Sequence, residues 1–463
     1  MKKLLLLNPP GTKRYFRDYF CTCVSKAKYY YHPIDLVYLS GILNKDFELS
    51  VIDAIAEQAS QIQTLENIKK INPEIIIFLI SSPSYEEDVP FLIELKSRFP
   101  SAEFIGIGDV YREIKSKAFP LHPFLDATLM DFSTSDILAY LNGNKDAPVK
   151  NVIFRKGGQI VEGPEKHDYG NFDMPVPRWD LFPLDKYVFP FSIRGKWATM
   201  LTDFGCPYTC TFCPMSTVGF KLRKIETVID EIRLLKKLGI NEQFFRDQTF
   251  GVNKKRTYEM LDRFINEKLD LSWTCFSRVD VVNEELLKKM KEAGCHTVMF
   301  GIETSNEELL IAYKKNIAIK QILDALALCK KVGLKTCGTF IIGLPGETKE
   351  SILRTIEFSK KIDIDYASFN IATPRFGTSF RKDMLEKNLV DEKIIKMDSA
   401  KSKPVFNEKE DGLSNDEIFG LQRKAIKEFY FRPKYLAKRI FKICSIYEFK
   451  EHMKQGISIL MEI

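Results

Sequence analysis

The feature that most constrains the fold is an alternation of short apolar segments with helical segments, which occurs in two separate parts of the chain. In the first part, residues 1–145, the apolar segments are KKLLLLN, ELSVID, EIIIFLI and EFIGIG. Continuous apolar strands separated by helices are typical of a parallel sheet that is covered on both faces. Residues 1–145 are therefore predicted to form a doubly wound, Rossmann-like α/β domain.

The second alternation spans residues 197–380 and predicts six strand-helix units, with the strands WATMLTD, QFFRDQ, LSWTCFSR, HTVMFGI, KTCGTFII and YASFNIAT. Six such units predict a partial (β/α)6 TIM-like barrel, because the sequence after residue 380 has no further clear strand. Residues 146–196 are rich in proline and large apolar side chains, which predicts an ordered connector. Residues 381–463 are predicted to be helical.

The composition is that of a large globular protein. The 463 residues are 45% apolar and 28% charged, and the net charge of +7 is spread along the chain. This charge is compatible with an anionic substrate, a nucleic acid or a membrane surface, and it requires none of them. The run Leu4–Leu7 is too short for a signal peptide, and no segment reaches the roughly 18 apolar residues of a membrane helix. We therefore expect a cytoplasmic protein.

Ten cysteines are expected to be reduced in that compartment. Cys206, Cys210 and Cys213 lie together in TDFGCPYTCTFCPMS, just after the first predicted barrel strand. A structural zinc site usually has four ligands in two pairs, so three cysteines without a fourth indicate a site that is left open. The pair Cys21 and Cys23 forms a CxC with an unassigned role. The remaining cysteines are expected in the core: Cys275, Cys295, Cys329, Cys337 and Cys444.

The carboxyl ends of the predicted N-terminal strands carry small and polar residues. Ligands of doubly wound sheets bind beyond those ends, so these residues form a candidate ligand-binding rim. The same residue types also form ordinary turns, and both interpretations remain open. The rim residues are Asn8, Pro9 and Pro10 of NPPG, Asp53, Ser81, Ser82 and Ser84 of SSPS, and Gly106 and Gly108 of GIGD.

The spacing CxxxCxxC, with the aromatic Phe212 directly before the last cysteine, resembles the motif of radical S-adenosylmethionine enzymes. The resemblance implies that the three thiolates bind three irons of a [4Fe-4S] cluster, while S-adenosylmethionine chelates the fourth iron. It also implies that one electron from the cluster cleaves S-adenosylmethionine to a 5′-deoxyadenosyl radical. No acid-base pair is required for hydrogen abstraction, and no catalytic residue is predicted.

The resemblance implies further cofactor-binding residues at the ends of the later barrel strands. Arg278 is expected to pair with the methionine carboxylate, and Glu303 to accept hydrogen bonds from the ribose or amine. FFRDQTF departs from the usual Gly-Gly-Glu at its position, so the role of Asp247 is open. The implied residues are Phe212, Asp247, Ser277, Arg278, Gly301, Glu303, Ile342 in FIIGLPGET, and Thr373 in NIATPRFGT.

Four segments together resemble the cobalamin-binding class of these enzymes: NPP, the connector Pro175–Tyr187, GCPYTCTFCP and GLPGET. The resemblance implies cobalamin on the N-terminal domain and methylation of an unactivated carbon. Two departures exist, because the chain lacks Asp-x-His-x-x-Gly and has GIGD in place of Gly-Gly-x-His. The alternatives are ring closure, oxidation or rearrangement with the same cofactors, or an N-terminal domain that binds no cobalamin.

The expected partners follow from the same interpretation. A one-electron donor such as flavodoxin or ferredoxin is implied by the resemblance, and no nucleic acid is expected. The segment SNDEIFGLQRKAIKEFYFRPKYLAKRIFKI interleaves basic with apolar residues. It is either a packing helix or an amphipathic surface for peripheral membrane contact. The 35 phenylalanines of the whole chain, together with this basic and aromatic segment, are compatible with a small-molecule or lipid-like substrate.

Overall fold

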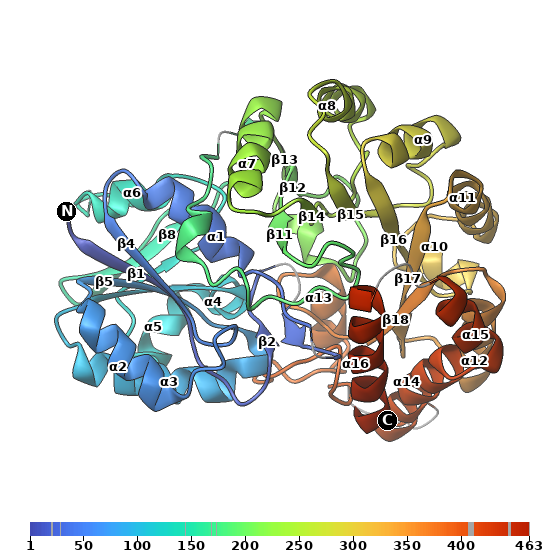
Figure 1. Ribbon diagram of the computed structural model, residues 1–463. Helices are drawn as coiled ribbons and strands as arrows, with labels where there is room; N and C mark the ends of the chain where they lie inside the picture. Colours follow the sequence, from blue (N-terminus) through green and yellow to red (C-terminus); the bar gives the residue numbers. More distant parts are fainter. Residues whose placement is uncertain are drawn as a thin grey trace.

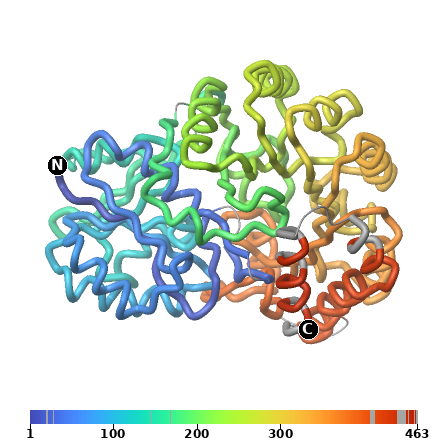
Figure 2. The backbone as a smooth tube through the Cα atoms, viewed as in Figure 1, coloured from blue at the N-terminus to red at the C-terminus, as the bar shows by residue number. Residues whose placement is uncertain are grey.

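The computed structural model describes residues 1–19, 22–27, 29–143, 145–167, 169–172, 174–405, 412–442 and 446–462. Two α/β units lie side by side, and the C-terminal helices pack beside the second unit (Figures 1 and 2). Among the described residues, no helix is both long and apolar enough to cross a membrane.

The N-terminal unit contains a seven-stranded sheet. Its first five strands in spatial order are parallel, and the last two pair antiparallel. The four predicted strands are present, whereas the three-residue β7 was too short to be predicted. The last two strands form a hairpin inside the expected connector, so the sheet extends beyond residue 145. The order is β4 (Glu48–Asp53), β1 (Lys3–Asn8), β5 (Ile75–Leu79), β6 (Glu103–Ile107), β7 (Ala127–Leu129), β8 (Val152–Lys156) and β9 (Gln159–Glu162).

Helices cover both faces of this sheet because alternate strand residues point to opposite sides. In β1, Leu4 and Leu6 belong to a core shared with the second unit, whereas Leu5 and Leu7 belong to a separate core. The side chain of Ser60 caps the start of α2 by accepting from the Gln63 amide. The helices are α1 (Ile34–Leu43), α2 (Gln61–Ile71), α3 (Tyr85–Arg98), α4 (Asp109–Ile114), α5 (Ala118–Leu121) and α6 (Asp136–Leu141).

The second unit is a half-barrel, which confirms the predicted partial barrel. Its six strands follow chain order and every neighbouring pair is parallel: β11 (Trp197–Met200), β14 (Glu242–Phe245), β15 (Ser272–Ser277), β16 (Cys295–Glu303), β17 (Lys335–Ile342) and β18 (Tyr366–Ile371). Most of the outer helices begin at a polar cap residue, such as Asn253, Asn283 or Thr348. These helices are α7 (Ile225–Lys237), α8 (Lys254–Asn266), α9 (Glu284–Glu292), α10 (Glu307–Ala312), α11 (Ile319–Val332) and α12 (Lys349–Lys361).

Short elements lie where the two units meet. A hairpin of β2 (Tyr15–Phe16) and β3 (Cys23–Val24) follows β1, and a small sheet has the order β10 (Gly170–Phe172), β13 (Phe220–Arg223), β12 (Asp203–Gly205). The cysteine motif lies in the loop between β12 and β13. Single 3-10 turns are η1 (Ser82–Ser84), η2 (Lys115–Lys117), η3 (Trp179–Leu181) and η4 (Pro214–Thr217).

The C-terminal region is helical, as predicted, with α13 (Ser379–Glu386), α14 (Asn415–Tyr430), α15 (Pro433–Lys442) and α16 (Ile446–Glu462). Helix α14 packs against β18 and α12. Figure 1 shows α16 near the centre of the molecule, beside α14 and towards the N-terminal unit.

Buried polar contacts fasten the two units together. Arg246 at the end of β14 pairs with Asp18 of the N-terminal unit through two bonds of 2.7 and 3.0 Å. Lys221 of β13 donates to Asp131 at 2.9 Å, and both side chains are almost fully buried. A buried ion pair is held where its geometry is good, so these pairs fix the relative position of the two sheets.

Candidate functional site

The loop that carries the three predicted metal-binding cysteines is fixed by its backbone. It begins after Gly205, whose φ of 85° lies in the left-handed region and where a Cβ would stand 1.8 Å from the Gly219 carbonyl oxygen. Only glycine is accommodated at that point. Further on, the Thr211 amide donates to the Tyr313 carbonyl at 3.1 Å, and the Phe380 amide donates to the Thr211 carbonyl at 3.0 Å.

A cavity of about 1040 Å³ begins at this loop and lies at the carboxyl ends of the barrel strands. Its wall includes all three cysteine side chains of the loop. It also includes residues at the ends of several barrel strands. The structure thus brings together eight of the residues predicted from the sequence: Cys206, Cys210, Cys213, Phe212, Ser277, Arg278, Gly301 and Glu303.

Arg278, at the end of β15, is held beside the thiols by contacts on several sides. Its guanidinium carbon lies 3.8 Å from the centre of the Tyr208 ring, and Nη1 lies 3.7 Å from the Cys210 sulfur. Asp280 accepts from Nε and Nη2 at 2.9 Å each, and Nη2 also donates to the Lys315 carbonyl at 2.8 Å. The site therefore contains an oriented cation next to the cysteine loop.

Glu303 and Lys315 form a buried ion pair on the same wall, with 2.8 Å between Lys315 Nζ and Glu303 Oε1. A Cβ at Gly301 would lie 2.4 Å from that oxygen and 2.6 Å from that nitrogen, so the missing side chain makes room for the pair. The β16 register shifts between Gly301 and Glu303, and Glu303 has a φ of 65°. Burial lowers the pKa of Lys315, but Glu303 and the Cys210 sulfur outweigh it and raise the pKa above its ordinary value.

The three thiols border the same cavity and lie close enough to influence one another. Burial, followed by the neighbouring Cys206 and Cys210 sulfurs, raises the pKa of Cys213 to about 12. A bound metal reverses this effect, because a thiol that ligates a metal loses its proton. Among the described residues, no three His, Cys, Asp or Glu side chains converge on one point as ligands of a single ion. Three thiols around a shared volume suit a cluster of several irons with one iron left open.

Three residues predicted to bind the cofactor lie outside this cavity wall. Asp247 accepts from the amide and hydroxyl of Thr202 at 2.6 and 2.5 Å and from the Asp203 amide at 3.1 Å, so it ties β14 to β12. Ile342 is fully buried in the core. Thr373 donates its hydroxyl to the Ile371 carbonyl at 3.0 Å.

The predicted N-terminal rim is closed by its own hydrogen bonds. Arg17, from the hairpin, is buried and donates to the side chain of Asn8 at 2.9 Å and to the carbonyl oxygens of Pro9 and Pro10 at 2.8 and 3.2 Å. Asp53 accepts from Asn8 at 3.0 Å and from the Tyr187 hydroxyl at 2.9 Å. These rim groups therefore face protein rather than a cavity.

The rim serines Ser81, Ser82 and Ser84 also make hydrogen bonds within the protein. Ser84 donates to Asp88 at 2.6 Å and lies 2.8 Å from the Ser81 hydroxyl. Ser82 donates to the Ile395 carbonyl at 2.7 Å, because residues 394–398 return to this edge of the sheet. Gly106 leaves room for the Tyr111 ring, which a Cβ would approach to 2.1 Å.

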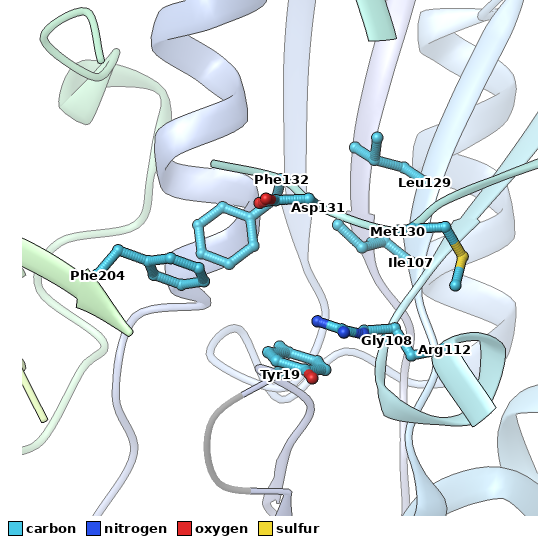
Figure 3. A pocket seen from close by; sticks show the side chains of 9 residues that line it. All are labelled: Tyr19, Ile107, Gly108, Arg112, Leu129, Met130, Asp131, Phe132 and Phe204. Carbon is cyan, nitrogen blue, oxygen red and sulfur yellow. The ribbon is translucent and has the colours of Figure 1, made fainter. Parts of the chain in front are cut away.

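The rim residue Gly108 borders a small hollow, which is shown in Figure 3. Arg112 reaches towards the ring of Tyr19, with 4.4 Å between the guanidinium carbon and the ring centre, and Phe132 meets Phe204 edge to face at 5.2 Å. The hollow measures about 10 Å³. That volume holds at most one water, so a corrin ring does not fit here in this conformation.

The cavity wall also contains groups that the sequence did not single out. Lys315 follows α10 in a loop without periodicity, and Tyr208 and Thr249 are isolated polar residues, so no pattern marked them. The hairpin and the segment that follows it contribute Phe16, Cys23, Lys26, Ala27, Tyr29 and Tyr31 to the wall.

The predicted core cysteines Cys275, Cys295 and Cys329 are buried, and Cys337 is buried but also borders the cavity. Cys21, Cys444 and the last residue of the basic segment, Ile443, lie outside the described residues.

Known proteins resemble this chain in sequence and in fold. The family model described as the radical SAM superfamily matches residues 201–359. An uncharacterized methyltransferase of Pyrococcus horikoshii is 34% identical over 425 residues, which cover 88% of this chain and 90% of the relative.

Two solved structures share the fold at low sequence identity. The radical S-adenosylmethionine methyltransferase TsrM from Kitasatospora setae, with cobalamin and a [4Fe-4S] cluster bound, has a TM-score of 0.66 and 18% identity, covering 83% of this chain and 78% of its own. The cobalamin-dependent radical enzyme OxsB, with aqua-cobalamin and S-adenosylmethionine bound, has a TM-score of 0.71 and 15% identity, covering 100% of this chain and 72% of its own.

Proposed function

Because this chain belongs to the radical S-adenosylmethionine superfamily, we propose that it is a cobalamin-dependent methyltransferase that acts on an unactivated carbon. One observation carries the proposal: the three thiols, Arg278 and the Glu303–Lys315 pair line a single cavity at the barrel edge. The methyltransferase relative supports the reaction class, and the fold shared with TsrM and OxsB supports the domain organisation.

In this proposal Cys206, Cys210 and Cys213 hold a [4Fe-4S] cluster, which supplies one electron for the cleavage of S-adenosylmethionine. Two cationic side chains, Arg278 and Lys315, line the same cavity as the thiols, which supports the binding of an amino-acid carboxylate there. Arg278 is oriented beside Cys210 and would pair with the carboxylate of the methionine. Glu303 would accept from its amine, and Gly301 leaves the backbone open to close approach.

Cobalamin, which supplies the methyl group, is proposed to bind in the same large cavity rather than against the closed rim. The cavity reaches the N-terminal unit at Phe16, Tyr29 and Tyr31, and its volume of about 1040 Å³ is of the order that large ligands require. These aromatic side chains would cover one side of the cofactor. The absence of Asp-x-His-x-x-Gly implies that no histidine of that motif ligates the cobalt.

The enzyme is proposed to work in the cytoplasm, where reduced thiols and a one-electron donor such as flavodoxin or ferredoxin are available. The bound substrate is proposed to be a small or lipid-like molecule. The wall of the half-barrel, with residues 197–380, would present the cluster, and the N-terminal unit and the C-terminal helices would enclose it.

Anaerobic reconstitution with iron, sulfide and cobalamin, followed by S-adenosylmethionine and a reductant, tests the proposal. We expect 5′-deoxyadenosine together with S-adenosylhomocysteine, and a product heavier by one methylene. Deoxyadenosine without homocysteine would instead favour ring closure, oxidation or rearrangement. Retention of no cobalamin would limit the enzyme to the cluster chemistry, and absence of deoxyadenosine would overturn the proposal.

A further inference from the structure

The last helix of the chain presents one apolar face to the cavity. Phe449, Met453, Ile457 and Leu460 recur at spacings of four, four and three residues, which places them on one side of α16. All four line the cavity, and they are 48–60% exposed. The exposed surface of these four side chains therefore borders the cavity.

A second apolar wall belongs to α14 and α15. Phe419, Ile426 and Tyr430 of α14 line the cavity, as does Leu436 of α15, which is 45% exposed. Phe369 of β18 continues this wall towards the barrel. The end of the cavity away from the thiols is thus bordered by aromatic and aliphatic side chains from three helices and one strand.

Several polar groups at this end are engaged with the protein, whereas the buried Nε2 of Gln455 on α16 has no hydrogen-bond partner among the described residues. Gln422 donates to the carbonyl oxygens of Phe369 and Ala400 at 3.2 and 3.1 Å, and Tyr430 donates to the Ala367 carbonyl at 2.6 Å. The guanidinium of Arg439 lies 4.3 Å from the centre of the Tyr366 ring and donates to its hydroxyl at 2.8 Å.

The two ends of the cavity therefore differ in chemistry. Arg278, Glu303 and Lys315 gather at the thiol end, where a charged cofactor is needed, and the helical end is largely apolar. Water in contact with a broad apolar wall is unfavourable, and a ligand with matching apolar surface removes that contact. A corrin edge, which is rich in amides, matches this wall less well than a hydrocarbon does.

We propose that the walls of α14, α15 and α16 bind the extended hydrocarbon part of the substrate, so that the substrate is a long-chain lipid. This rests on the proposed function, because the reacting carbon would lie at the thiol end. The apolar face of α16 then determines substrate specificity, because the length of the cavity limits the length of the hydrocarbon chain that can bind.

Equilibrium binding of cis-parinaric acid, an 18-carbon fluorescent fatty acid, to the full chain tests this proposal. We expect saturable binding, which oleate displaces and octanoate does not. Ile457→Asp should weaken binding at least tenfold, since it places a charge on the apolar face. Ile62→Asp is the matched control, because Ile62 on α2 is 70% exposed and lies outside the cavity wall, and it should leave binding unchanged.

If Ile457→Asp fails to fold by circular dichroism, Met453→Trp replaces it, because a larger apolar side chain shortens the cavity and should weaken oleate more than decanoate. Lack of saturable binding, or equal loss in the Ile62 control, would overturn the proposal. A wild-type dimer that Ile457→Asp converts to monomer would also overturn it, because α16 would then contact a second copy. Fatty-acid binding requires no cluster, so its failure is separate from failure to form deoxyadenosine.

Discussion

The two parallel sheets of this chain end in opposite ways. At the carboxyl edge of the N-terminal sheet, buried polar side chains satisfy one another around Arg17, and the adjoining hollow measures about 10 Å³. At the carboxyl edge of the half-barrel, Arg278 and the Glu303–Lys315 pair border a cavity of about 1040 Å³ that begins at three thiols. Both edges carry the small and polar residues that mark ligand sites in α/β proteins, yet in the part of the chain that the structure describes the large cavity lies at the barrel edge.

The two edges differ because different segments of the chain cover them. Arg17 of the hairpin donates to Asn8 at the end of β1 and to Asp88 of α3, and residues 394–398 cover Ser82. Over the barrel edge, the hairpin aromatics and the C-terminal helices remain at a distance and form a wall. Residue types at strand ends therefore indicate where ligands can bind, and the covering segments decide whether a site is open.

The largest effect is expected from the thiols at the open edge. Replacement of Cys210 by alanine removes one cluster ligand, so iron content, the brown absorbance and deoxyadenosine formation should all be lost. Cys275→Ala is the control, because Cys275 is a buried core residue and should retain the cluster. Equal iron content in both variants would contradict the assignment.

At the closed edge, Arg17→Met should cost about 3–5 kcal/mol of unfolding free energy, because it leaves Asp88 buried without its partner. Urea unfolding measures this change. The control is Arg98→Met, whose ion pair with Glu94 is about half exposed and should cost less than about 1 kcal/mol. A loss at position 17 no larger than at position 98 would mean that Arg17 does not hold the rim closed.

Lys315→Met should weaken S-adenosylmethionine binding by about tenfold or more, since Glu303 would lose its buried partner beside the thiols. Isothermal titration of the reconstituted protein gives the affinity. Lys320→Met removes an exposed ion pair with Asp324 and should leave the affinity unchanged. An unchanged affinity in Lys315→Met would separate this pair from the cofactor site.

The stability of the closed rim is also expected to depend on pH. Burial raises the pKa of Asp53 from 3.8 to about 6, against the opposing hydrogen bonds of Ala56, Tyr187 and Tyr30. The folded state therefore keeps a proton that the unfolded state releases. The stability that Asp53 contributes is complete below about pH 4 and is lost as the pH rises to about 6.

Asp53→Asn removes this titration. The free energy of unfolding of the wild type should fall relative to the variant across that window, by about 3 kcal/mol. Urea unfolding at a series of pH values measures the difference. Parallel curves for the two proteins would show that Asp53 is ionised in the folded rim.

The sequence predicted the strands because their apolar runs depend on local pattern alone. It predicted the thiols and Arg278 because motif spacing and strand ends are visible in one dimension. It did not predict Arg17, whose partners Asn8 and Asp88 lie on β1 and α3, because tertiary packing alone unites them. Lys315 was not predicted either, because tertiary packing alone brings it to Glu303. Asp247 accepts from Thr202 instead of lining the cavity, which shows that a polar residue at a strand end can join neighbouring strands.

The central claim is that the thiols hold a cluster with one iron open to S-adenosylmethionine. Electron paramagnetic resonance of the reduced, reconstituted protein, recorded with and without S-adenosylmethionine, tests it most directly. We predict the signal of a reduced [4Fe-4S] cluster whose g values shift when S-adenosylmethionine is added. A signal that S-adenosylmethionine leaves unchanged, or a protein that binds zinc in place of iron, would contradict the account.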